Sequence, residues 1–382
     1  MIRPFRVGLL CVALEAAVMW FGVTAHHDGD WTALFCTGAL RPQPPAFSAE
    51  HIYLFPNATG YDGQFYHYLA HDPLPQGDIP RFMDNARLRY RRILAPLAAH
   101  LLALGQTQWV HTAFFAMLLA AAGAGGYWLA QWFILQGQSA WFGLSFAALP
   151  PILIAANRAT IDAWLAAFCV AYLIYASKSA WRCYLVLLCA ALIRETGVLL
   201  TAGHVLYCLT TRQWRSAVVY GSAVLPALFW WQYVARHVPH TAELSDWTYG
   251  LPLSGIAKQF VFWTMGSPAP FLLRVFDALC LVFTIAVMTD ICVRLLRRRF
   301  DIFTCHLAAW LALSLVLASL STALAYGYWS SSFSYARSLA PMFLLWSLQQ
   351  WTAGRRLAAS CPLLLSLRVG VDIVLNAGPK NL

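Results

Sequence analysis

The chain has 382 residues, of which 60% are hydrophobic and only 11% are charged. This number of polar side chains is too small to cover the surface of a soluble domain. The composition therefore excludes an ordinary soluble protein and predicts an all-α integral membrane protein. The formal net charge of +10 does not indicate a nucleic-acid partner. The basic residues stand in small groups at the ends of apolar segments, where the positive-inside rule places them.

The first apolar segment, residues 5–25, follows Arg3 and Arg6 and is long enough to cross a bilayer. We interpret it as an uncleaved transmembrane helix rather than a signal peptide, with the amino terminus in the cytoplasm. Residues 26–92 then form a long first extracytoplasmic loop that contains juxtamembrane helices. Residues 93–105 are apolar but about half as long as a span, which favours a surface or re-entrant helix.

The rest of the chain predicts a polytopic helical bundle of about eleven transmembrane helices in all. Within residues 184–208, Arg194 and Glu195 lie at the middle; because charges are costly at the bilayer centre, we expect two shorter helices that meet there. Residues 235–270 form a second extracytoplasmic loop, and residues 1–382 are expected to be a single transmembrane domain. The other predicted helices cover residues 109–135, 141–156, 161–176, 218–234, 271–293, 303–326, 338–351 and 357–375.

The first loop contains an aromatic and acidic motif, YDGQFYHYLAHDP, at residues 61–73. Gly63 permits a turn or a close approach of two backbones. Asp62 could act as a general base that deprotonates an acceptor hydroxyl. The alternative is that Asp62 caps the surface helix that begins near Gln64, where its carboxylate accepts free backbone N–H groups.

Four arginines follow in the motif RLRYRR, just before the short apolar segment. Arg87, Arg89, Arg91 and Arg92 are placed at headgroup depth, where guanidinium groups bind phosphate in a bidentate way. The alternative is that they anchor the loop to anionic membrane lipids.

A divalent metal is an open alternative to a cofactor-free site. His67, His71 and Asp72 fall on one face of the predicted helix, with Asp62 nearby, and this spacing can hold an ion. Solvated interface histidines are the competing interpretation.

Three further groups of charges lie beside or inside apolar segments, where ionisable residues usually face a cavity or a partner. Arg158 and Asp162 are four residues apart, as an ion pair on a helix would be. Arg194 could hold a phosphate leaving group, with Glu195 as its ion-pair partner. Arg337 stands alone in the apolar sequence FSYARSLAP.

Three motifs together resemble bacterial multi-span proteins of the GT-C glycosyltransferase superfamily that are linked to surface glycopolymer formation. They are YDGQFYHYLAHDP, RYRRILAPLAAHLLALG and ALIRETGVLL. The mannosyltransferases that build glycosylphosphatidylinositol anchors are a more distant likeness. The resemblance implies that Asp62 is the catalytic acid of the first outer loop and that Arg87, Arg89 or Arg194 holds the donor phosphate. The segment 157–162 departs from the family pattern, which leaves a second acidic site residue open.

The resulting hypothesis is an inverting glycosyltransferase of the bacterial inner membrane. It would transfer a sugar from a polyprenyl-phosphate donor to a glycan or lipid acceptor on the extracytoplasmic face, in contact with membrane lipid. The alternatives are a transporter or flippase for a lipid-linked sugar and a non-catalytic protein of envelope-polymer assembly. With Asp62 as the base, the predicted substrate-binding residues are Tyr61, Gln64, Tyr66, Arg87, Arg89, Arg158, Asp162, Arg194, Glu195 and Arg337.

Overall fold

The computed structural model describes residues 3–47, 50–241, 250–264, 271–319, 328–329 and 332–375. About 78% of the chain is helical, and the sheet in the described part is a parallel pair of two-residue strands, β1 (Thr37–Gly38) and β2 (Leu54–Phe55). The prediction of an all-α protein is confirmed. Residues 242–249 and 265–270 of the predicted second loop, and residues 320–326 of the predicted helix 303–326, lie outside the described residues.

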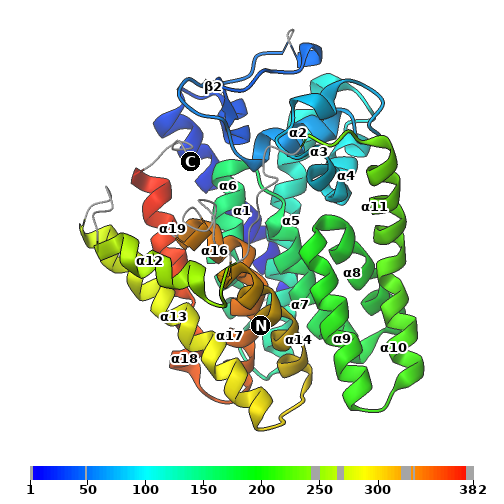
Figure 1. The fold of residues 1–382 in the computed structure, drawn as a ribbon, viewed down its shortest axis with the longest axis vertical. Coiled ribbons are helices and arrows are strands. Elements are labelled where there is room, and N and C mark those ends of the chain that lie inside the picture. Colours follow the sequence, from blue (N-terminus) through cyan, green and yellow to red (C-terminus); the bar gives the residue numbers. More distant parts are fainter. Residues whose placement is uncertain are drawn as a thin grey trace. The chain divides into compact units, whose positions relative to one another are not determined.

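The chain divides into two compact units, whose helices and strands are labelled in Figure 1. The first comprises Met1–Val198, Ala223–Leu244 and Asp372–Leu382, and the second comprises Leu199–Ser222 and Ser245–Val371. The first unit holds α1 (Pro4–His26), η1 (Trp31–Phe35), η2 (Pro45–Phe47), α2 (Asp62–His71), η3 (Ile79–Phe82), α3 (Ala86–Arg91), α4 (Leu94–Leu102), α5 (Thr107–Leu135), η4 (Ala140–Ala148), α6 (Pro150–Arg158), α7 (Asp162–Lys178), α8 (Ala180–Ile193), η5 (Glu195–Gly197) and α11 (Leu225–His237), together with both strands.

The second unit holds most of α9 (Val198–Thr210) and of α19 (Leu363–Leu375), and η6 (Ser222–Val224) lies at the boundary. A buried ion pair joins α13 to α19, where Arg368 Nη2 lies 2.8 Å from Asp277 Oδ2. The other elements of this unit are α10 (Trp214–Gly221), α12 (Ser254–Thr264), α13 (Phe271–Leu296), α14 (Ile302–Ala318), α16 (Ser332–Ser338), α17 (Ala340–Thr352) and α18 (Arg356–Ser360).

Five helical segments among the described residues are long and apolar enough to cross a membrane, and a bent pair would make a sixth. These findings support a membrane protein, whereas the expected number of about eleven spans is not confirmed. The predicted span over residues 141–156 is not one continuous helix: it consists of η4 and α6, which are bent by 50°. Pro150 and Pro151 begin α6, and a proline cannot continue the preceding helix. The five segments are Pro4–His26, Thr107–Leu135, Trp214–His237, Phe271–Leu296 and Arg356–Leu375.

Three predictions about the first 210 residues are confirmed. The first apolar segment is the helix α1. The short segment after the arginines is α4, a nine-residue helix. The predicted break within residues 184–208 is present, because Arg194 has an extended backbone, with φ −156° and ψ 145°, and separates α8 from α9.

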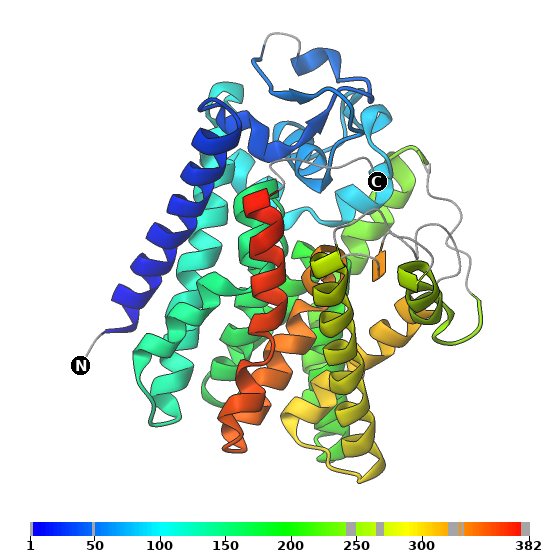
Figure 2. The ribbon, with the colours of Figure 1, turned by 90° about the vertical axis from the view of Figure 1, so that its left-hand side faces the viewer.

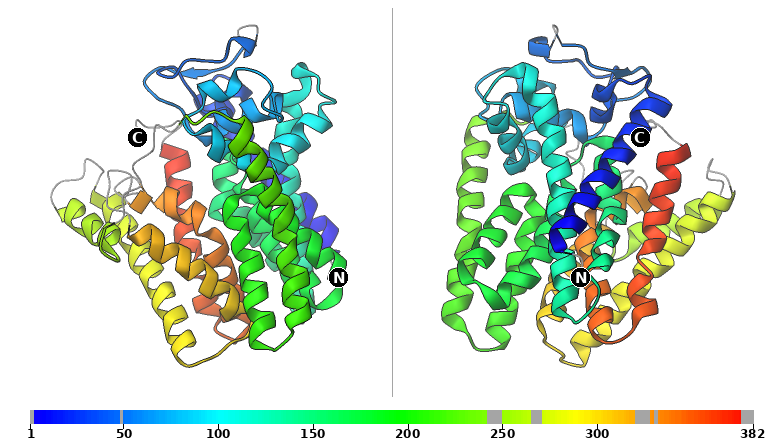
Figure 3. Two further views of the ribbon diagram at one scale, coloured as in Figure 1. Left: turned by 45° about the vertical axis from the view of Figure 1, so that its right-hand side comes forward. Right: turned by 180° about the vertical axis from the view of Figure 1, so that it is seen from behind.

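Glycines bring α1 and α5 into close contact, as Figure 3 shows from behind. A Cβ added at Gly8 would lie 2.7 Å from the carbonyl oxygen of Gly123, and one added at Gly126 would collide with the Cys11 side chain. In lipid there is little hydrophobic force between helices, so their association depends on close packing. Small residues permit that packing, because they let two apolar helices approach to backbone contact.

We expect Gly8→Ala to lower the stability of the protein by about 1–3 kcal/mol, because the new methyl group overpacks the α1–α5 contact. Gly22→Ala is the matched control on the same helix, since nothing outside that helix lies within 4 Å of its added Cβ. Thermal unfolding of both variants in detergent measures the difference. Equal melting temperatures would contradict the packing argument.

The segment between α1 and α4 folds as a compact layer beyond the end of α1 (Figure 2). Its apolar core includes Phe47, Phe65, Tyr68 and Tyr90. Gln64, fully buried, fixes the loop to α2: its side-chain oxygen accepts from the backbone N–H of Gly38 (3.2 Å), and its amide donates to the carbonyl oxygen of Thr59 (3.0 Å). These contacts set the position of α2.

Candidate functional site

The helix α2 begins at Asp62, after Tyr61 in an extended conformation. A carboxylate in the first turn of a helix is stabilised by the free N–H groups there. The next residue, Gly63, touches other backbone directly: an added Cβ would collide with the carbonyl oxygens of Arg158 and Phe35. The predicted close approach at Gly63 is confirmed, and it brings the start of α2 against the end of α6.

The helix α3 directs Arg89 toward the start of α2. Arg89 Nη1 lies 2.7 Å from Asp62 Oδ1. The same guanidinium donates through Nε (2.9 Å) and Nη2 (2.7 Å) to the two oxygens of Asp84, and its Cζ lies 4.7 Å from the centre of the Phe65 ring. Arg89 is therefore held between two carboxylates over an aromatic face.

Arg92 follows the last residue of α3 and connects the loop with the break after α8. Its Nε and Nη2 donate to the two oxygens of Glu195, at 2.8 and 2.7 Å. Its Nη1 donates to the Tyr66 hydroxyl at 2.6 Å and lies 3.9 Å from Asp62 Oδ2. One guanidinium thus holds η5 by a bidentate ion pair and α2 by a hydrogen bond to Tyr66.

The helix breaks supply the remaining charges. Arg194 forms an ion pair with Asp162, the first residue of α7, and its Nε lies 3.8 Å from Glu195 Oε1. Arg158, the last residue of α6, places its guanidinium 4.6 Å from the centre of the Tyr61 ring. We call the four acids and four arginines of this region the charge cluster: Asp62, Asp84, Asp162, Glu195, Arg89, Arg92, Arg158 and Arg194.

Opposite charges hold Arg89, Arg92 and Glu195 ionised against the effect of burial. Burial disfavours the charged forms of Arg89 and Arg92. Asp62 and Asp84 outweigh this effect at Arg89 and raise its pKa. Glu195 does the same at Arg92 and raises its pKa. Burial also works against ionised Glu195, yet Arg92 and then Arg194 lower the pKa of Glu195 to about 2. The ion pair of Arg92 with Glu195 is therefore kept at neutral pH.

Most of the predicted site residues meet in this cluster or beside it. Asp62, Arg89, Arg158, Asp162, Arg194 and Glu195 belong to it, and Tyr61 and Tyr66 contact it. Arg87 does not: its Nε donates to the carbonyl oxygen of Val238, at 2.9 Å. Gln64 is used by the loop backbone, as described above, and Arg337 lies on α16 in the second unit.

Two members of the cluster were not selected from the sequence. Asp84 precedes Arg89 by five residues. Side chains pair regularly along a helix at spacings of three or four residues, so a spacing of five does not predict this contact. Arg92 was visible in the RLRYRR motif, but its partner Glu195 is 103 residues away. Glu195, the acid in ALIRETGVLL, was the only sequence feature that indicated such a contact, because an acid in an apolar segment requires a partner.

The residues proposed to bind a metal divide between two places. Asp62 contacts Arg89, and Asp72 accepts the backbone N–H groups of Gln76 (3.4 Å) and Gly77 (3.3 Å) beyond the end of α2. His67 and His71 lie together, 3.0 Å apart between their Nε2 atoms, and their other partners are described below.

No protein-family model, curated protein or solved structure matches the chain. The resemblance to the GT-C superfamily therefore stays an expectation.

We expect acid to weaken the fold through Glu195. Its pKa in the folded protein, about 2, lies below the ordinary value of 4.5, so its contribution is complete above pH 4.5 and is lost as the pH falls toward 2. Glu195→Gln should cost about 3 kcal/mol at neutral pH and should flatten the loss of thermal stability between pH 5 and pH 3.

The control for this prediction is Asp78→Asn, because Asp78 pairs with Arg81 at 3.2 Å on an exposed surface, where both side chains are more than 70% accessible. That variant should melt like the wild type at every pH. The prediction is wrong if Glu195→Gln follows the acid dependence of the unmodified protein.

Proposed function

We propose that this protein is a membrane glycosyltransferase that transfers a sugar from a polyprenyl-phosphate donor to a hydroxyl of a glycan or lipid acceptor. The observation that carries the proposal is the contact of Asp62 with Arg89 and Arg92 at the start of α2. It joins an acid that can take a proton with cations that can hold a phosphate. Apolar helices able to cross a membrane agree with a donor that resides in the bilayer.

In the proposed reaction the acceptor oxygen attacks the anomeric carbon of the sugar while Asp62 takes the hydroxyl proton. The bond between the anomeric carbon and the phosphate oxygen breaks, and the phosphate keeps the electron pair. The product is a glycoside of inverted configuration together with a polyprenyl phosphate. The developing negative charge on that phosphate requires fixed cations nearby.

Arg92 and Arg194 suit this second task. Both face the carboxylate of Glu195, and two oxygens on one centre are also what a phosphate presents to a guanidinium. The Glu195 side chain is 25% accessible whereas that of Arg92 is 5% accessible. A phosphate that approaches from the side of Glu195 would compete with this carboxylate for the two arginines.

The proposal includes a side of the membrane. Arg3 and Arg6 precede the first span, which favours a cytoplasmic amino terminus. With α1 as a single crossing, residues 26–92 and Asp62 are extracytoplasmic, and the membrane would be the bacterial inner membrane.

We expect Asp62→Asn to lower sugar transfer by about 100-fold or more, the usual contribution of a general base. The measurement is transfer of label from radiolabelled polyprenyl-phosphate hexoses, by the purified protein in detergent, to membrane lipid and glycan acceptors. Asp84→Asn is the matched control, because Asp84 contacts the same arginine as Asp62 but has no part in proton transfer. It should keep most of the activity.

Unfolding curves of both variants separate loss of chemistry from loss of structure. Wild-type transfer by a folded Asp62→Asn variant would exclude Asp62 as the base. If the wild type transfers no sugar but moves a lipid-linked sugar across vesicles, the protein is a transporter. If it does neither, the proposal is wrong and the remaining alternative is a non-catalytic role in envelope-polymer assembly.

A further inference from the structure

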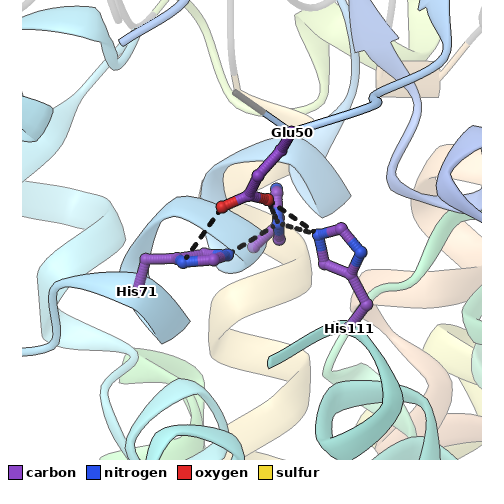
Figure 4. A group of neighbouring side chains, drawn as sticks. Glu50, His71 and His111 are labelled. Atoms are coloured by element: carbon purple, nitrogen blue, oxygen red, sulfur yellow. Dashed lines mark hydrogen bonds and ion pairs between the residues drawn. The ribbon is translucent and has the colours of Figure 1, made fainter. Parts of the chain in front are cut away.

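Four metal-binding side chains converge at a place distinct from the charge cluster. Glu50 precedes β2, His67 and His71 are one turn apart on α2, and His111 lies near the start of α5. One ligand atom from each lies within 4.8 Å of the ligand atoms of the others. Figure 4 shows Glu50, His71 and His111 pointing toward one another from separate segments.

Four of the distances between these atoms, from 2.9 to 3.9 Å, are close to those around a tetrahedral metal ion. His67 Nε2 lies 3.0 Å from His71 Nε2 and 2.9 Å from His111 Nε2. Glu50 Oε2 lies 3.1 Å from His111 Nε2 and 3.9 Å from His67 Nε2. Ligand atoms at the usual zinc–nitrogen distance would be about 3.3 Å apart in a tetrahedron. Small side-chain movements are enough to admit the ion.

Hydrogen bonds among these four residues do not satisfy all their atoms. His67 Nε2 faces two other imidazole nitrogens, and a neutral imidazole nitrogen is a donor or an acceptor but not both. Glu50 Oε1 is buried and accepts no hydrogen bond in the described part of the chain, and His71 Nδ1 lies 3.7 Å from it. A buried carboxylate oxygen beside three imidazoles is the arrangement that a cation completes.

Aromatic rings cover His67, and burial disfavours protonation of His67 and His71. Phe35 stacks on His67 with ring centres 4.2 Å apart, and Phe47 covers the same ring at 5.4 Å. Burial, with a smaller effect of the neighbouring imidazoles, lowers the pKa of His67, and burial lowers the pKa of His71 to about 4. The neutral imidazole is the form that binds metal.

We propose that Glu50, His67, His71 and His111 form a binding site for one Zn²⁺ ion. Three imidazole nitrogens and one carboxylate oxygen suit zinc, whereas Mg²⁺ and Ca²⁺ prefer oxygen ligands alone. A cavity of about 620 Å³, lined by Glu50, Gln108 and His111 among others, borders the site and gives the ion access from outside.

The zinc would join three segments that are distant in sequence: the loop at Glu50, the helix α2 and the start of α5. His67 is five residues after Asp62, which is about 140° around a helix, so the ion would hold α2 on a different face from the charge cluster. The ion would thus stabilise the layer between α1 and α4. This proposal does not rest on the proposed sugar transfer.

The test uses the full-length protein in detergent, stripped with a chelator, dialysed and then titrated with Zn²⁺. We expect one zinc per chain by mass spectrometry of the metal, together with a rise in melting temperature. The double variant Glu50→Gln, His111→Gln should bind zinc with an affinity at least about 100-fold lower. The control is His51→Gln, whose side chain is 88% accessible and lies outside the group of four.

Two results would overturn the proposal: no bound zinc in the wild type, or zinc held by the double variant with unchanged stoichiometry and affinity. If the double variant does not fold, cobalt decides the matter in the wild type. The intense visible absorption of four-coordinate Co²⁺, removed by added zinc, supports the site. The weak absorption of six-coordinate Co²⁺ contradicts it.

Discussion

The ion pairs of the charge cluster around Asp62 are the constraint on which the first unit depends. A charge removed from water is tolerated only with a partner, and loss of one partner leaves the other uncompensated. The bidentate pair of Arg92 with Glu195 joins α2 and α3 to the break after α8, and Arg194 extends this connection to α7. Asp62 is therefore connected to three other parts of the chain: α3, the break after α8 and α7.

The elements that the sequence predicts correctly are those determined locally. Length and apolar character define α1 and α5, and the two adjacent charges at Arg194 and Glu195 indicate the break between α8 and α9. The bend within the predicted span over residues 141–156 was missed because its hydropathy is continuous while two prolines divide its backbone. Hydropathy measures the cost of transfer into lipid, and it contains no information about the direction of the chain.

The candidate site was predictable in its chemistry and only partly in its membership. Asp62 and Arg89 meet as expected, but Arg87 lies on another side of α3 and contacts Val238 instead. The motif RLRYRR does not reveal which arginines face inward, because that depends on where the short helix begins. Likewise His67 and His71 were visible as a pair, whereas Glu50 and His111, 61 residues apart, share no pattern in the sequence.

The long separation between Arg92 and Glu195 has a consequence for biosynthesis. The ribosome must add 103 residues after Arg92 before its carboxylate partner exists, and α5 and α7 are made in that interval. During this time Arg92 lacks its bidentate carboxylate partner, and of its described contacts only Tyr66 and Asp62 have been made. The loop that is translated first thus reaches its final form late, when the chain has already passed α8, and a truncated nascent chain would contain its residues without their arrangement.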